Sequence, residues 1–172
     1  LFDEEALAGH VNPSIDGEAE KTAAELLHVM GNPSNQSVVP AEFPLEINCE
    51  RVSRPNGHQV FVELVTGEPL NDQQIIDAFR GFGLQGDLPS RPNQAIHIVD
   101  QIDVDLHLWS NGTSFSERPE PSKDLKTGMA VVVGDLSVEG CTIRFSAYSH
   151  NTVRGAAGGV VYLAEFVLAN TS

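Results

Sequence analysis

Arg51 and His58 are the two side chains whose types and spacing most clearly predict chemistry in this chain. A guanidinium group binds both oxygens of a carboxylate, and an imidazole exchanges protons near neutral pH. If Asn56-Gly57 forms a two-residue turn, Arg51, Pro55 and His58 share one face of a β-hairpin, with about 13 Å of strand between Arg51 and Pro55. This arrangement predicts a site for a small substrate that carries a carboxylate and a carbonyl group. The alternative is a hairpin with a solvated arginine and a histidine at the edge of its turn.

Two further groups are candidates for ligand binding. Glu18 and Lys21 lie three residues apart, which puts them on one face of a predicted helix, where the alternative role is a surface ion pair. The run His150-Asn151-Thr152-Val153-Arg154-Gly155 precedes a segment rich in Gly and Ala. Its simplest structural role is an Asn or Thr cap on a closely packed helix.

Asp103, Asp105 and His107 alternate with the apolar residues between Ile102 and Leu108, which is the pattern of a half-buried strand. The three polar side chains would spread over about 13 Å of that strand. One metal ion would then need ligands from elsewhere, so we expect no metal site and interpret the row as a polar sheet face or a subunit interface.

The rest of the chain predicts the elements that position these side chains. Helices are expected over Asp16–Met30, with Asp16 as the cap, over Asn71–Phe82 and over 152–169; residues 32–42 and 110–127 are expected to be loops. Strands are expected over Leu45–Val52, Val60–Val65, Ala95–Val99, Ile102–Leu108, Gly128–Val133 and Cys141–Tyr148. Neighbouring strands in sequence favour a single α+β domain over residues 1–172, with a mixed, mostly antiparallel sheet and helices on one face.

Composition excludes several classes of function. With 10 basic and 24 acidic side chains the formal net charge is −14, so nucleic acid and anionic membranes are poor partners. No apolar run reaches the ~20 residues that a membrane span needs, and no signal peptide is visible. Two cysteines, Cys49 and Cys141, form no disulfide framework. We therefore expect a cytoplasmic protein with reduced thiols.

Together the Arg51–His58 and His150–Gly159 runs resemble the carboxy-terminal half of aspartate-semialdehyde dehydrogenase in its archaeal and fungal form. In that family an arginine precedes the catalytic histidine by seven residues, and a glycine stands just before the histidine; both features hold here. The segment Asp16–Lys21 is similar to the family's Glu-x-x-Lys segment. The runs Gly128–Gly134 and Arg118–Pro121 extend the likeness.

The resemblance implies a fold, a reaction and a role for each residue. The fold is the carboxy-terminal domain of the glyceraldehyde-3-phosphate dehydrogenase type. The family reduces aspartyl phosphate with NADPH, a step in lysine, threonine and methionine biosynthesis. His58 would be the acid/base, Arg51 would bind the substrate carboxylate, Glu18 the amino-acid substrate, Lys21 phosphate, and Asn151 would lie near the nicotinamide. The family also implies a homodimer formed through the sheet.

The likeness covers only part of such an enzyme. The nucleophilic cysteine and the glycine-rich NADP-binding domain are expected in a segment before Leu1, so the fragment alone is predicted to be inactive. The helix over 152–169 is expected to return to that domain. Its apolar surface, made by Val153, Val160, Val161, Leu163, Phe166 and Val167, is therefore predicted to contact a partner chain or to be mobile.

Three residues depart from the family pattern: Glu50 beside Arg51, Ser53 in place of a proline, and Asp135 in place of a basic residue. They leave open a related acyl reductase, such as a malonyl-CoA reductase. They also leave open a non-catalytic homologue that acts as a dimerising module binding small acids. The choice between NADP and NAD depends on residues outside this chain.

Overall fold

A computed structural model describes residues 15–50, 52 and 54–171, and it divides the chain into two compact units, Leu1–Pro55 and Asn56–Ser172. Two residues of interest lie outside the described residues. They are Arg51, which is expected to bind the substrate carboxylate, and Ser53, which departs from the family pattern.

The first unit contains one helix and a short hairpin. Helix α2 (Glu18–Val29) confirms the predicted helix, but its N-cap is Gly17, in a left-handed conformation, and not Asp16. Strands β1 (Asn32–Ser34) and β2 (Ser37–Val39) pair antiparallel where a loop was predicted. Asn35 makes this turn possible because it adopts a positive φ of 52°, which asparagine tolerates better than most residues.

The predicted hairpin around Asn56-Gly57 is wrong. Residues 45–50 and Val52 are in no strand, so strand β3 (His58–Val65) has no partner immediately before it in the sequence. Its partner is β6 (Thr142–Ser149), which lies about eighty residues further along and pairs with all of β3 in antiparallel register. A local turn signal was present, but a distant strand supplies the pairing.

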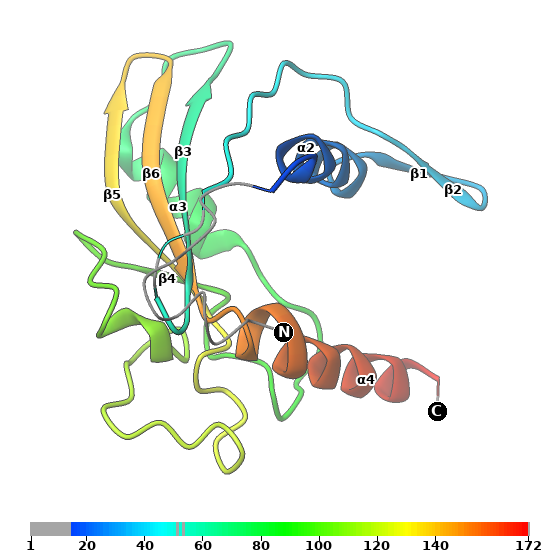
Figure 1. The fold of residues 1–172 in the computed structure, drawn as a ribbon, viewed down its shortest axis with the longest axis vertical. Coiled ribbons are helices and arrows are strands. Elements are labelled where there is room, and N and C mark those ends of the chain that lie inside the picture. Colours follow the sequence, from blue (N-terminus) through cyan, green and yellow to red (C-terminus); the bar gives the residue numbers. More distant parts are fainter. Residues whose placement is uncertain (1–14, 51, 53, 172) are drawn as a thin grey trace. The chain divides into compact units, whose positions relative to one another are not determined.

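The second unit is built on a four-stranded mixed sheet in the order β3-β6-β5-β4. Strands β5 (Val131–Glu139) and β6 form an antiparallel pair, while β4 (Ile96–Ile98) joins β5 in parallel. In Figure 1, β3, β6 and β5 run side by side as three long ribbons, with helix α3 behind them. The predicted α+β class with a mostly antiparallel sheet is confirmed.

Helix α3 (Asp72–Gly81) covers one face of this sheet. Its N-terminus has a complete capping box: the Asn71 side chain accepts from the Gln74 amide at 3.0 Å, and the Gln74 side chain accepts from the Asn71 amide at 3.0 Å. The helix packs against β6 through Phe79, whose ring meets that of Phe145 edge-on at 5.2 Å.

The core lies at the end of the sheet where β5 begins and β6 ends. Val132 is fully buried, and Met129, Ala130 and Tyr148 are 1–3% exposed. This is the end at which β6 runs into the segment His150–Gly155, so the best-packed part of the unit supports the residues that the sequence singles out as functional.

The strand predicted over Ile102–Leu108 is wrong. Asp103 accepts the amides of Asp105 and Leu106 at 3.0 Å each, which folds the chain into a turn that leads to a 3₁₀ helix at His107–Trp109. Short acidic side chains commonly bind nearby backbone amides in this way and so compete with strand formation. Within the described ranges no group of three or more potential ligands is placed to hold a metal ion.

The ring of Phe115, in the connection between β4 and β5, stacks with two imidazoles. The ring centroids of His97 and His107 are 4.4 and 4.5 Å from that of Phe115. His97 Nδ1 lies 2.8 Å from Ser110 Oγ, and His107 Nδ1 accepts the Asp103 amide at 3.0 Å. Burial lowers the pKa of both histidines, and the nearby His107 lowers the pKa of His97 further.

The last helix begins as a π-helical turn, Val153–Ala157, and continues as α4 (Gly158–Asn170). Glu165 ties it to its own unit by accepting the Ser90 hydroxyl at 2.6 Å and the Ser90 amide at 3.0 Å. Val160, Leu163 and Val167 are nevertheless 66%, 59% and 48% exposed, so its own chain does not wholly cover it. No helix in the described part of the chain is long and apolar enough to cross a membrane.

Removing the cap of α3 should cost a measurable part of the free energy of unfolding. Asn71→Ala is expected to lower it by about 1 kcal/mol, because the Gln74 amide loses its acceptor. Asn71→Asp keeps an acceptor oxygen and should lose much less. Urea denaturation of the two variants measures the difference, and equal losses would contradict the capping role.

Stability should decrease below neutral pH because of His97 and His107. Their pKa values are lowered in the folded state, so below the unfolded value of about 6.5 the unfolded chain binds more protons. The free energy of unfolding should therefore fall as the pH is lowered from about 7 towards the folded pKa values. Urea denaturation between pH 7.5 and 5.5 should show a weaker pH dependence in a His97→Gln, His107→Gln double variant, and an unchanged dependence in His28→Gln, whose imidazole is exposed. The same dependence in all three proteins would contradict this assignment.

Candidate functional site

His58 is the first residue of β3 and is exposed. Its Cα partner on β6 is Ser149, two residues before Asn151. The pairing of β3 with β6 therefore brings together two runs that lie about ninety residues apart in the sequence. It replaces the predicted pairing of His58 with Pro55, which the structure contradicts.

Gly57, the residue before His58, is held by Asn151 and Tyr148. The amide of Gly57 donates to Asn151 Oδ1 at 2.9 Å. Gly57 has a φ of +100°, and a Cβ at this position would collide with the ring of Tyr148. Only glycine satisfies both conditions without strain. Tyr148 is itself buried and donates its hydroxyl to the Val104 carbonyl at 2.9 Å.

Asn151 stands in a turn organised by the preceding residue, His150. The His150 imidazole is 4% exposed and lies edge-on to Trp109, with 4.4 Å between the ring centroids. Its Nδ1 accepts the amides of Thr152 at 3.2 Å and Val153 at 3.3 Å. Burial lowers the pKa of His150, which favours the neutral ring that can accept these bonds.

Glu18 and Lys21 belong to the first unit, at the start of α2. Lys21 forms its ion pair with Glu25 at 3.7 Å, one turn further along, and both side chains are well exposed. Glu18 is half-buried, and its carbonyl accepts the Thr22 hydroxyl at 2.8 Å. The shared helix that the sequence predicts for this pair is confirmed; the ligand-binding roles stay predictions.

Glu50, one of the departures from the family pattern, has a hydrogen-bond partner. Asn48 donates its side-chain amide to the Glu50 carboxylate at 3.1 Å. The negative charge that neighbours Arg51 in sequence is therefore engaged by a neutral donor. Cys49, on the other side of Glu50, is half-buried, with its Sγ 3.8 Å from Thr22 Oγ1, and Cys141 is half-buried before β6.

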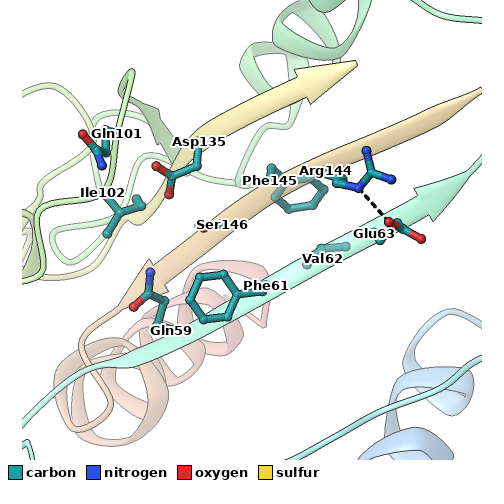
Figure 2. A pocket seen from close by; sticks show the side chains of 10 residues that line it. All are labelled: Gln59, Phe61, Val62, Glu63, Gln101, Ile102, Asp135, Arg144, Phe145 and Ser146. Carbon is teal, nitrogen blue, oxygen red and sulfur yellow. Dashed lines mark hydrogen bonds and ion pairs between the residues drawn. The ribbon is translucent and has the colours of Figure 1, made fainter. Parts of the chain in front are cut away.

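A shallow hollow of about 580 Å³ lies on the sheet away from His58. Figure 2 shows Gln59, Phe61 and Glu63 along β3 beside Ser146 and Arg144 of β6. Because side chains alternate along a strand, His58 points to the opposite face from these β3 residues. The hollow is therefore distinct from the candidate site.

The sequence singles out His58 and Asn151 but misses the residues between them. Tyr148 is the clearest functional residue that the sequence does not reveal. A tyrosine in a strand gives no sign that its ring will fill the space beside Gly57. The Asn56-Gly57 pair did carry a usable signal, since such a dipeptide favours positive φ. In the sequence it predicts a hairpin turn, whereas in the structure it lets the chain approach Tyr148 and Asn151.

The side chains of His58 and Asn151 determine which ligand groups this site can bind. An exposed imidazole at a strand end can give or take a proton from a ligand in solution. Asn151 uses its Oδ1 for Gly57, so the group it offers to a ligand is its Nδ2 amide, a hydrogen-bond donor. Together they suit a ligand with a carbonyl or amide oxygen near a group that exchanges a proton.

The chain is similar in sequence to known enzymes over more than 90% of its length. The aspartate-semialdehyde dehydrogenase of Methanothermobacter thermautotrophicus is 33% identical over 170 residues, which cover 94% of this chain and 45% of that protein. The malonyl CoA reductase (NADP) of Metallosphaera sedula is 29% identical over 91% of this chain and 43% of its own length. No protein-family model matches the chain.

The fold comparison agrees. The crystal structure of aspartate semialdehyde dehydrogenase with NADP from Candida albicans superposes with a TM-score of 0.66 and 25% identity, covering 91% of this chain and 44% of that one. The chain thus spans less than half the length of the relatives that it matches. As its motifs predict, the chain is related in sequence and in fold to the aspartate-semialdehyde dehydrogenases.

Proposed function

We propose that this chain is the carboxy-terminal, catalytic and dimerisation part of a cytoplasmic oxidoreductase that reduces aspartyl phosphate to aspartate semialdehyde with NADPH. The observation that carries the proposal is the exposed His58, held through Gly57 to Asn151, in a chain related to aspartate-semialdehyde dehydrogenases. His58 would act as the acid/base on the acyl group. Arg51 would bind the substrate carboxylate, and Glu18 and Lys21 would bind the amino-acid and phosphate groups.

The residues present fit one end of a nicotinamide cofactor. Asn151 Nδ2 is a donor, and the carboxamide of the nicotinamide ring supplies an acceptor oxygen. When bound, the cofactor supplies the hydride. The thiol that attacks the acyl phosphate and the groups that bind the rest of the cofactor are assigned to the other half of the enzyme. The exposed apolar surface of α4 suits contact with that half.

The open sheet face suits the homodimer interface that the family resemblance implies. Phe61 is 76% exposed in the middle of β3. Nearby, Arg144 bridges Glu63 at 2.7 Å and Glu139 at 3.2 Å (Figure 2 shows the Glu63 contact). An exposed aromatic ring beside paired charges is typical of interface centres and their polar rims.

A second candidate function has one observation in its favour. The malonyl CoA reductase of Metallosphaera sedula matches this chain nearly as well as the dehydrogenases do. Malonyl-CoA also carries a carboxylate and an acyl group, so the proposed roles of Arg51 and His58 would not change. Assays with both acyl substrates separate the two enzymes, and turnover of neither would favour a non-catalytic module that binds small acids.

Two substitutions separate the proposed roles. In the chain joined to the segment encoded upstream of it, His58→Ala should lower kcat by about 10²–10⁴-fold with little change in KM. Arg51→Ala should raise KM for aspartate semialdehyde, by roughly 100-fold if both oxygens are bound. The assay follows NADP reduction in the presence of aspartate semialdehyde and phosphate.

His28→Ala and Arg80→Ala are the matched controls, since both side chains are exposed and lie in other segments. They should leave both constants unchanged. Wild-type turnover that survives His58→Ala would rule out the acid/base role. An upstream segment without a glycine-rich nucleotide motif followed by a cysteine would count against the whole enzyme.

The dimer proposal has its own test. Phe61→Asp should convert a dimer into a monomer in sedimentation experiments, because a charge would replace the exposed ring at the centre of the face. Phe82→Asp, at a ring that is 60% exposed at the end of α3, should leave the mass unchanged. A wild-type monomer, or a Phe61 variant that remains dimeric, would contradict the assignment of this face.

A further inference from the structure

Asn151 makes a contact that its expected role beside a cofactor does not explain. Its Oδ1 accepts the Gly57 amide at 2.9 Å, across 94 residues of sequence. Gly57 immediately precedes His58, the proposed acid/base. An asparagine that served only a ligand would not need to bind the backbone next to the histidine.

The hydrogen bond between Gly57 and Asn151 fixes the backbone immediately before His58. Gly57 has a left-handed conformation, with a φ of +100°, and the Tyr148 ring occupies the space beside its Cα. Beyond it, His58 is paired with Ser149 in the β3–β6 ladder. The backbone on the amino-terminal side of His58 is thus held by Asn151 and Tyr148, and the backbone on the carboxy-terminal side by strand pairing.

Asn151 is itself held rigidly. The buried His150 accepts the amides of Thr152 and Val153 with its ring, and its carbonyl accepts the amides of Arg154 at 3.0 Å and Gly155 at 3.2 Å. These bonds close the turn that opens the π-helical segment and α4. The side chain of Asn151 therefore projects from a well-fixed backbone and can transmit its position to Gly57.

We propose that Asn151 is a positioning residue for His58, acting through its Oδ1 on the Gly57 amide, separately from any contact that its Nδ2 makes with a ligand. The inference rests on the proposed function for the role of His58. The Asn151 side chain then has two roles: its oxygen orients the histidine, and its amide nitrogen binds the ligand. It also links the start of the last helix to the acid/base residue.

Asp and Ala replacements of Asn151 separate the two tasks. Asn151→Asp keeps an acceptor for Gly57 but removes the Nδ2 donor, while Asn151→Ala removes both. Asn170→Ala is the matched control: it removes an exposed asparagine at the far end of α4, whose side chain donates to the Phe166 carbonyl at 2.7 Å.

The first readout needs no activity. Amide hydrogen exchange of Gly57, measured by NMR on this chain, should become about tenfold faster in Asn151→Ala, the effect expected from the loss of one hydrogen bond of about 1.4 kcal/mol. Exchange should stay near the wild-type rate in Asn151→Asp and in the Asn170 control. Gly57 exchange that is equally fast in the wild type and in Asn151→Ala would overturn the proposal.

The second readout uses the chain joined to its upstream segment. Asn151→Ala should lower kcat and raise KM for NADP, whereas Asn151→Asp should recover most of kcat and keep the raised KM. A purely structural role would not give this split. If the two variants lose kcat equally, the Oδ1 contact does not position His58. If the joined protein turns over no acyl substrate, the proposed function fails, while the exchange data still decide whether Asn151 holds Gly57.

Discussion

The hydrogen bond between the Gly57 amide and Asn151 Oδ1 is the constraint on which the candidate site depends. It joins the start of β3 to the start of the last helix, two points that the strand pairing of β3 and β6 brings close but does not itself lock. Gly57 can make the contact because it has no side chain in the space that Tyr148 fills. A larger residue at position 57 would have to displace a buried ring whose hydroxyl is already bonded.

Two of the three departures from the family pattern, Asp135 and Glu50, have a local structural context. Asp135, where a basic residue is expected, has a positive φ of 56° at an irregularity between Gly134 and Ser137 in the pairing of β5 with β6. Aspartate is one of the few residues that tolerate this conformation, so local backbone geometry gives its presence a reason unrelated to substrate. Glu50 is likewise engaged by Asn48. Neither residue by itself therefore favours the alternative of a non-catalytic homologue.

Sequence reasoning predicted the elements that local pattern determines. Helix α3 followed from its cap and periodicity, and β3 and β6 followed from their apolar runs. The strand predicted over Gly128–Val133 covers only the start of β5, which continues to Glu139. It failed where partners are distant or side chains compete with the backbone: Asn56-Gly57 suggested a local hairpin, but β6 supplies the partner, and Asp103 folds its own segment into a turn. His58 and Asn151 were identifiable from their motifs, whereas the bond that links Asn151 to the turn before His58 depends on strand register, which no local pattern encodes.

In the proposed function, this chain supplies the acid/base histidine to a dehydrogenase whose nucleotide-binding half is a separate structural part. Complementation can test this role of His58. The upstream half is produced as its own polypeptide, this chain is added in increasing amounts, and NADP reduction by aspartate semialdehyde and phosphate is measured. Activity should rise to saturation with the wild-type chain and be nearly absent with the His58→Ala chain. Equal activity with both chains would contradict it.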